Sequence, residues 1–307
     1  MTTPRRLFLQ STAGIILLGC TKKSALDTSR QVAQVVTAQA TQDGAGVSLH
    51  RALGGRALSM LDPFLLLDEF RSDNPDDYLA GFPSHPHRGF ETVTYMLEGA
   101  MEHRDNVGNQ GRLRPGSAQW MTAGRGIVHS EMPKQERGLM WGYQLWVNLP
   151  AAKKMIKPRY QDISPESIPT VEQDGVKVRV VAGEALGQTG PVSGIEVAPL
   201  FLDIALSKGT DFWQKLPPRH NAFVFMIQGS MQVGGNRQEV KEGQLAVLSP
   251  GAFFEAHGLG NGGRAMLIAG RPLGEPVARK GPFVMNTDDE LQQAFDDYRS
   301  GRLTEGS

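Results

Sequence analysis

The chain has 307 residues, and its 32 Lys and Arg residues balance its 32 Asp and Glu residues. This balance creates no basic surface field, so the composition excludes nucleic acid as a partner and favours a small molecule. Glycine (36 residues) and proline (19 residues) are frequent. Turn formers at this density predict an all-β protein of many short strands, and the length is sufficient for two domains.

The N-terminus resembles an export leader. Arg5 and Arg6 precede an apolar run over 7–18, which is shorter than the roughly 20 residues that a membrane span needs. Arg-Arg-x-Phe-Leu resembles the twin-arginine export signal, and the stretch that ends at Cys20 (Leu-Leu-Gly-Cys) resembles the cleavage box of bacterial lipoproteins. We therefore expect residues 1–19 to be a signal peptide, with Cys20 lipidated on the periplasmic side of a bacterial membrane. The alternative is an uncleaved apolar N-terminus with an incidental cysteine.

Cys20 is the only cysteine in the chain. An intrachain disulfide is therefore excluded, and so are iron–sulfur clusters and cysteine-rich zinc sites. Any metal bound by this chain must be held by nitrogen and oxygen ligands. If Cys20 is lipidated, the lipid is also the only membrane attachment that the sequence predicts.

Alternating apolar residues between Gly, Pro and Asn predict two sets of strands. Residues 32–47 indicate an opening hairpin, and the Pro-rich segment 151–175 indicates a crossover. The other predicted strands are 89–97, 119–122 and 141–149 in the first half, and 176–182, 200–206, 222–227, 231–233, 244–248, 253–256 and 265–269 in the second. A capping box at Thr287 to Glu290 predicts an amphipathic helix over 288–299.

These elements divide the mature chain into three parts. We expect a tether and first strand over 20–44, a first β-domain over 45–170, and a second β-domain over 171–307 that ends in the helix. The second domain lacks paired ligands, because Ala222 stands two residues after His220 and Leu259 two residues after His257. We expect no metal there.

Two short pairs in the first domain predict a metal site. His85 and His87 are separated by one residue, and so are His129 and Glu131. On a strand, side chains two residues apart share one face. If the two strands face each other inside a barrel, three imidazoles and one carboxylate meet at a point, which suits a divalent metal. The alternative is a set of unrelated surface histidines.

Several stretches of the chain resemble the pirin family, the two-barrel members of the cupin superfamily. They are LDPFLL (61–66), HPHRGFETV (85–93), QWMTAGRGI (119–127), HSEM (129–132), QLWVNL (144–149) and GPFVMN (281–286). The resemblance spans nearly all of 32–300 but not the N-terminal leader. It implies two tandem jelly-roll-type cupin β-barrels with a short C-terminal helix.

The resemblance also implies iron held by three histidines and one glutamate, which fall on His85, His87, His129 and Glu131. Iron(II) is the first expectation, although Mn, Ni, Cu or Zn also suits three nitrogens and one oxygen. Glu91 is a competing carboxylate, because many cupins take their glutamate four residues after the second histidine.

We favour Glu131 and place Glu91, His103 and Arg125 around the ligands. A solvated loop is the alternative for His103, and a backbone-binding loop arginine for Arg125. A group of apolar residues could line an aromatic mouth or belong to the core: Phe82, Phe90, Trp120, Met121 and Met140.

Pirins resemble quercetinases, so the resemblance implies a metal-dependent dioxygenase of the quercetin 2,3-dioxygenase type. Such an enzyme opens the ring of a flavonol or related aromatic with dioxygen, and Glu131 would act as the general base. One alternative is a non-catalytic, iron-binding lipoprotein that senses redox state or stress. The export leader argues against a transcription-factor partner. A third class is a sugar or small-acid isomerase on the same scaffold.

Overall fold

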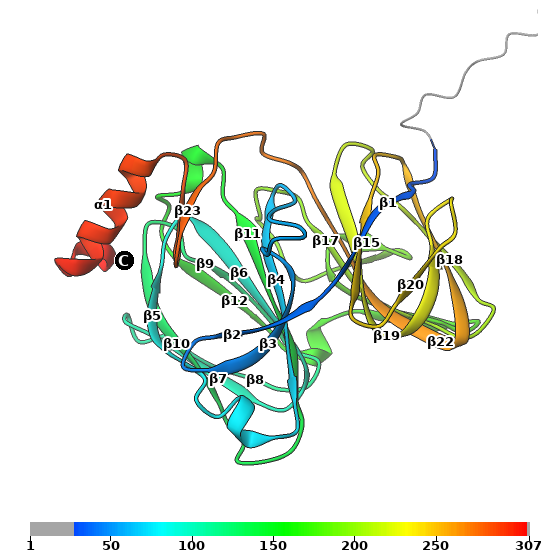
Figure 1. Cartoon of the computed structure of the whole chain (residues 1–307), viewed down its shortest axis with the longest axis horizontal. Coiled ribbons are helices and arrows are strands. Elements are labelled where there is room, and N and C mark those ends of the chain that lie inside the picture. Colours follow the sequence, from blue (N-terminus) through cyan, green and yellow to red (C-terminus); the bar gives the residue numbers. More distant parts are fainter. Residues whose placement is uncertain (1–27, 306–307) are drawn as a thin grey trace, which may run out of the picture.

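The computed structural model describes residues 28–305 and contains two β-barrels side by side (Figure 1). The all-β, two-barrel architecture expected from the sequence is therefore confirmed. Among these residues no helix is both long and apolar enough to cross a membrane. The predicted signal peptide and Cys20 lie outside the described residues.

The first barrel is built from a seven-stranded and a four-stranded sheet. The larger sheet has the order β12 (Arg159–Ile163), β9 (Ala118–Thr122), β6 (Phe90–Glu98), β11 (Met140–Asn148), β4 (Phe64–Ser72), β3 (Val47–Leu53) and β2 (Gln39–Asp43). The smaller sheet has the order β5 (Phe82–His87), β10 (Ile127–Pro133), β7 (Met101–Asp105) and β8 (Gln110–Leu113). Both histidine-bearing segments lie in the smaller sheet.

The second barrel is formed by one nine-stranded sheet. Its main path is β1 (Val32–Thr37), β21 (Gln244–Leu248), β19 (Asn221–Val233), β22 (Phe253–Gly270), β17 (Leu200–Leu206), β14 (Val176–Ala182) and β13 (Thr170–Gln173), with β18 (Asp211–Lys215) on β22 and β20 (Gln238–Lys241) on β19. A small hairpin joins β15 (Glu184–Ala185) to β16 (Gln188–Thr189). Short 3-10 turns occur at Pro75–Asp77, Ala151–Lys153, Pro165–Ser167 and Arg302–Thr304.

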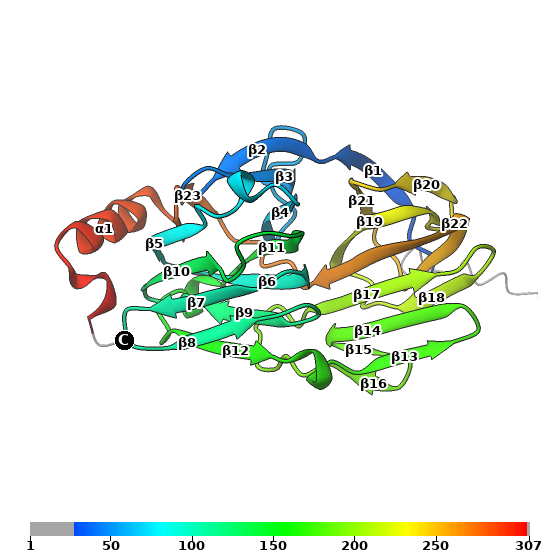
Figure 2. The ribbon, with the colours of Figure 1, turned by 90° about the horizontal axis from the view of Figure 1, so that it is seen from below.

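The expected opening hairpin is wrong in one respect. β1 does not pair with the strand that follows it but with β21 of the second barrel, from Val32 opposite Leu248 to Thr37 opposite Gln244. The hairpin is instead formed by β2 and β3. Figure 2 shows β1 alongside the second barrel and β2 over the first. The first strand thus ties the two barrels together, a pairing between distant segments that local periodicity does not reveal.

Two pairs of predicted short strands are single long strands. Residues 222–227 and 231–233 belong to β19, and residues 253–256 and 265–269 belong to β22. The register between β19 and β22 shifts on either side of Gly229, which has a φ of +68°. A glycine at such a β-bulge bends a strand without ending it. Gly229, which indicated a turn in the sequence, therefore marks a bend within one strand.

The C-terminal segment leaves the second barrel and packs on the first (Figure 1). It contains β23 (Ala278–Lys280), β24 (Phe283–Met285) and helix α1 (Asp288–Arg299). The predicted capping box and both predicted ends of α1 are confirmed. Apolar side chains of the segment, among them Phe283 and Leu303, form a core with Val128 of β10. The segment therefore covers the sheet that carries the histidines.

A buried ion pair fixes α1 to the first barrel. Arg88, which directly follows His87, donates from Nη1 to Asp297 Oδ2 at 2.7 Å, and its side chain is 4% exposed. Replacing Asp297 by alanine leaves a buried guanidinium without its carboxylate. We expect this variant to lose about 3–5 kcal/mol in the free energy of unfolding, measured by urea denaturation. The matched variant Asp296→Ala breaks an exposed pair with Arg299 and should lose about 0–1 kcal/mol. Equal losses would contradict this anchoring role.

The two barrels share one apolar core. It includes Tyr95, Trp120 and Tyr143 of the first barrel and Phe201 and Phe225 of the second. A buried polar network crosses the same interface: the Tyr95 hydroxyl donates to Asp203 Oδ2 at 2.6 Å, and Arg264 binds both oxygens of Asp203. These contacts occupy the outer face of the larger sheet of the first barrel and leave its inner face for the site.

Candidate metal centre

The three histidines lie on neighbouring strands of one sheet. β5 and β10 pair antiparallel, with His129 directly opposite His85 and Ile127 opposite His87. The expectation that the two strands face each other across the barrel is therefore wrong. Residues that are directly opposite on paired strands have close side chains, so adjacency brings the imidazoles together more directly than facing sheets would.

His85, His87 and His129 each offer one ring nitrogen, and these three atoms lie within 4.8 Å of one another. The ring centroids of His129 are 4.5 Å from His85 and 5.1 Å from His87. His87 and His129 are buried, and His85 is partly exposed. Burial, followed by the neighbouring imidazoles, lowers the pKa of His87 and of His129 well below the ordinary value. Both are therefore neutral at pH 7 and have a free lone pair.

The hydrogen bonds of the two β5 histidines suit a cation between them. Nδ1 of His85 lies 2.8 Å from the Pro83 carbonyl oxygen, and Nδ1 of His87 lies 3.4 Å from that of Pro282. A neutral imidazole that donates from Nδ1 presents a lone pair at Nε2. The two Nε2 atoms are only 3.0 Å apart. Two lone pairs at that distance repel each other, and a metal ion bound by both removes the repulsion.

His129 is the clearest sign of a missing ligand. Both of its ring nitrogens are buried and neither has a hydrogen-bond partner among the described residues. A buried polar atom without a partner costs free energy, so two such atoms on one side chain indicate that His129 binds a ligand. Three imidazole nitrogens with carbonyl groups behind two of the rings are an appropriate donor set for a divalent metal. The residues present therefore fit such an ion.

Glu131 lies on the same face of β10 as His129 but outside the group of three ligands. Its Oε1 is 3.0 Å from the Thr94 hydroxyl, and its Oε2 is 3.5 Å from Gln144 Nε2. The Thr94 hydroxyl is also 2.7 Å from Gln144 Oε1. Because a hydroxyl carries one hydrogen, it can donate to only one of these oxygens. Burial raises the pKa of Glu131, so its carboxyl accepts a proton more readily than that of an exposed glutamate.

Glu91 lies on the face of β6 that points away from the metal centre. β5 ends at His87, and the turn through Gly89 (φ +89°) interrupts the alternation before β6 begins at residue 90. Glu91 then shares a face with Val93, which packs in the core between the barrels, whereas Thr94 faces Glu131. The Thr122 hydroxyl donates to Glu91 Oε1 at 2.6 Å. This arrangement favours Glu131 as the carboxylate of the site.

The environment of Glu91 predicts a pH-dependent stability. Burial raises its pKa to about 7, and the bond from Thr122 offsets only part of this rise. A carboxyl whose folded pKa is raised stabilises the fold fully below its unfolded pKa of 4.5 and loses that contribution as pH rises through about 7. Relative to Glu91→Gln, we expect the metal-free protein to lose about 3 kcal/mol of unfolding free energy between pH 4.5 and 7.5, measured by urea denaturation. Parallel pH profiles of the two proteins would refute this.

The other two residues that we placed around the ligands, His103 and Arg125, lie at different distances from the site along the chain and in the fold. His103 on β7 is the register partner of Glu131, stacks on Tyr160, and has Nε2 3.2 Å from Asp162 Oδ2. Arg125, in the loop between β9 and β10, accepts a bond from Arg88 through its backbone oxygen. His103 is thus buried next to the site, which excludes the solvated-loop alternative for it.

A cavity of about 820 Å³ reaches the metal centre, lined by His85, His87 and Glu131. Of the five apolar candidates, Phe82 lines this cavity and Phe90 contacts the His87 ring at 5.0 Å. Trp120, Met121 and Met140 are core residues.

Sequence reasoning missed several side chains that line the cavity or contact Glu131, among them Trp146, Thr94 and Gln144. Thr94 and Gln144 are polar residues within largely apolar strands. This pattern could have indicated polar side chains on the inner face of the barrel.

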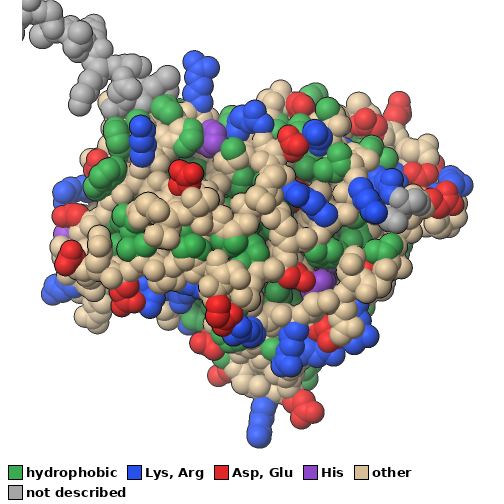
Figure 3. Space-filling model, turned by 180° about the vertical axis from the view of Figure 1, so that it is seen from behind, with side chains coloured by type: hydrophobic (Ala, Val, Ile, Leu, Met, Phe, Trp, Pro, Cys, Tyr) green, Lys and Arg blue, Asp and Glu red, His purple; other side chains and the backbone are tan. Residues whose placement is uncertain are grey.

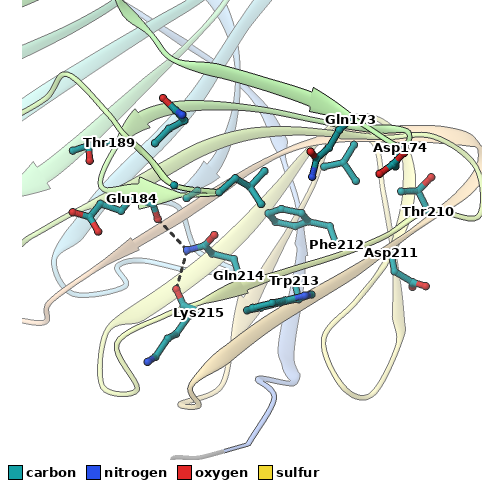
Figure 4. A pocket seen from close by; sticks show the side chains of 15 residues that line it. Gln173, Asp174, Glu184, Thr189, Thr210, Asp211, Phe212, Trp213, Gln214 and Lys215 are labelled. Atoms are coloured by element: carbon teal, nitrogen blue, oxygen red, sulfur yellow. Dashed lines mark hydrogen bonds between the residues drawn. The ribbon is translucent and has the colours of Figure 1, made fainter.

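The second barrel has a different kind of pocket. A cavity of about 620 Å³ between the β13–β14 turn, the β15–β16 hairpin and β18 is lined by no histidine (Figure 4). Gln214 there donates to the backbone oxygens of Glu184 and Lys215. His257 of this barrel pairs with Asp211 at 2.8 Å.

On the face of the molecule shown in Figure 3, basic side chains are interspersed with acidic ones.

Comparison with known proteins agrees with this architecture. Residues 46–147 match the Pirin family model, and residues 201–304 match the model of the Pirin C-terminal cupin domain. A Pirin-like protein of Caulobacter vibrioides is 49% identical over 276 residues, which are 89% of this chain and 99% of that protein. A Pseudomonas aeruginosa relative, 48% identical over 280 residues, covers 89% of this chain and 98% of its own length; its name, quercetin 2,3-dioxygenase, is itself provisional.

Among solved structures, the crystal structure of a quercetin 2,3-dioxygenase from Acinetobacter baumannii matches with a TM-score of 0.83 and 32% identity. The match covers 90% of this chain and 98% of that one. The two family models match in the expected order, and the relatives match over nearly their whole length. Both findings agree with the two-barrel fold. The chain therefore belongs to the pirin family of two-barrel cupins, with a three-histidine cluster in its first barrel that fits a divalent metal.

Proposed function

We propose that this protein is a metal-dependent dioxygenase that opens the ring of a flavonol or a related hydroxylated aromatic, with iron(II) as its metal. The observation that carries the proposal is the cavity of about 820 Å³ that reaches two of the three clustered histidines. It is large enough for a multi-ring aromatic, and Trp146 lines it. The names of relatives with the same fold agree with this activity.

The residues of the chain have separate roles in this reaction. His85, His87 and His129 would hold the metal, which when bound supplies a Lewis-acidic, redox-active centre for a substrate oxygen and dioxygen. Glu131 is the general base that accepts the proton of the substrate hydroxyl, because it lines the same cavity and burial raises its pKa. Thr94 holds the carboxyl by a hydrogen bond. Trp146 offers an aromatic face beside His87 at 5.4 Å.

Oxygen uptake tests the proposal. Metal-free protein is reloaded separately with Fe(II), Mn(II), Ni(II), Cu(II) and Zn(II) and mixed with quercetin in an oxygen electrode. We expect uptake with iron and none with redox-silent zinc. No uptake with any of these ions would refute the enzyme and favour the alternative, a non-catalytic iron-binding protein that senses redox state or stress.

We further propose that the chain is exported and anchored through a lipid on Cys20, as the twin-arginine-type leader and lipoprotein box indicate. In cells grown with labelled palmitate, the full chain should carry the label and fractionate with membranes. The variant Cys20→Ser should lose the label. An unlabelled, unprocessed chain would contradict the proposal.

A further inference from the structure

The cavity at the metal centre contains an arginine without an acidic partner. Arg279 of β23 lines the cavity together with His85 and His87, and it forms no ion pair with any described residue. The nearby carboxylate of Asp68 is already occupied, because Arg51 donates to both of its oxygens at 2.8 and 2.7 Å. Arg279 takes no part in the metal binding or the proton transfer proposed for this site.

Arg279 is nevertheless held in a defined position. Its Nη1 donates to the Leu65 backbone oxygen at 2.9 Å, and its Cζ lies 4.7 Å from the centroid of the Trp146 ring. The Trp146 ring in turn lies 5.4 Å from that of His87. Arg279 thus lies over the Trp146 ring, on which Phe90 also packs at 4.3 Å, and Trp146 connects the arginine to the metal ligand His87. Much of the side-chain entropy that a ligand contact would cost is already lost.

The charge on this guanidinium is poorly compensated. Arginine stays protonated in proteins. Burial, followed by repulsion from Arg51, lowers the pKa of Arg279, and attraction to Asp68 and Asp43 offsets only part of this change. The nearby carboxylates of Asp68 and Asp43 are both paired with Arg51, so this partly buried cation gains from a ligand that supplies a further negative charge. Its planar fork matches a carboxylate, which can accept two parallel hydrogen bonds from it.

We infer that the cavity selects a hydroxylated aromatic carboxylate, whose hydroxyl lies near the histidines and whose carboxylate pairs with Arg279 beside Trp146. This inference rests on the proposed function for the reacting end of the substrate. It adds the substrate class and assigns Arg279 as the residue that determines specificity. A neutral flavonol offers no carboxylate to this cation.

The test compares two probes of the same shape and different charge. Zinc-loaded protein is titrated by calorimetry at low salt with 6-hydroxy-2-naphthoate and with the neutral 6-hydroxy-2-naphthamide. The wild type should bind the carboxylate about tenfold or more tightly than the amide, as for a partly buried ion pair. Arg279→Gln should bring this ratio close to one while the affinity for the amide changes less than about twofold.

Lys280→Gln is the matched control, because Lys280 is the exposed neighbouring cation and lies toward Phe295 of α1. It should keep the wild-type ratio. Raising the salt concentration on wild-type protein should lower the ratio without changing the affinity for the amide, which tests the same contact without a mutation. A wild-type ratio near one, a ratio that survives in Arg279→Gln, or no binding of either probe would overturn the inference. Binding to zinc-loaded protein requires no turnover, so these results are independent of the quercetin assay.

Discussion

Replacing His129 by alanine is expected to abolish stoichiometric metal binding. His129 supplies the only ligand nitrogen of the cluster from β10, and the two remaining imidazoles lie close together on β5. Loss of a residue that merely orients a ligand already weakens metal affinity about 10- to 100-fold, so the loss of a ligand itself should exceed about 100-fold. Metal content per chain after dialysis, measured by elemental analysis, checks this.

Thermal unfolding gives a second measure of the same variant. In wild-type protein, added metal should raise the melting temperature, because it binds the folded state. In His129→Ala this rise should disappear. Without metal the variant should remain folded, since the substitution removes two buried nitrogens that have no partner.

His257→Ala is the control for the metal measurements. His257 lies on β22 of the second barrel, where it pairs with Asp211. Its loss should leave both the metal content and the metal-induced rise in melting temperature unchanged. Retention of one metal per chain in His129→Ala would show that the cluster is not the binding site.

The second large effect is expected from Glu131→Gln. Glutamine has nearly the same shape and keeps an oxygen for the bond from Thr94, but it cannot accept a proton. If Glu131 is the general base, quercetin turnover by the iron-loaded protein should fall about 100-fold or more. Initial rates of oxygen uptake at saturating quercetin measure this. Glu91→Gln, the same change on the other face of β6, should retain turnover within about threefold.

Metal affinity separates the two roles of Glu131. If its carboxylate also binds the metal, Glu131→Gln should weaken metal binding as well as turnover. If it acts only on the proton, the metal content stays normal while turnover falls. Full activity in Glu131→Gln together with an inactive Glu91→Gln would transfer the carboxylate role to Glu91 and contradict our assignment.

Several features of this protein were determined by the sequence alone, because they depend on neighbours along the chain. The spacing of two residues placed His85 and His87 on one face of β5, since side chains on a strand alternate. The Thr287 capping box located α1 at both ends, because caps act within one helical turn. The strands over 176–182, 200–206 and 244–248 agree with their predicted bounds for the same local reason.

Only the tertiary structure decided the contacts between distant segments. It paired β1 with the second barrel and made β5 and β10 neighbours rather than facing strands. Unbroken alternation would place Glu91 on the same face as His87, but the turn at Gly89 places it on the other face of β6. The C-terminal segment brought the Pro282 carbonyl to His87 and Arg279 into the cavity. Backbone pairing and packing between segments far apart in the sequence fix these positions, so local sequence patterns do not predict them.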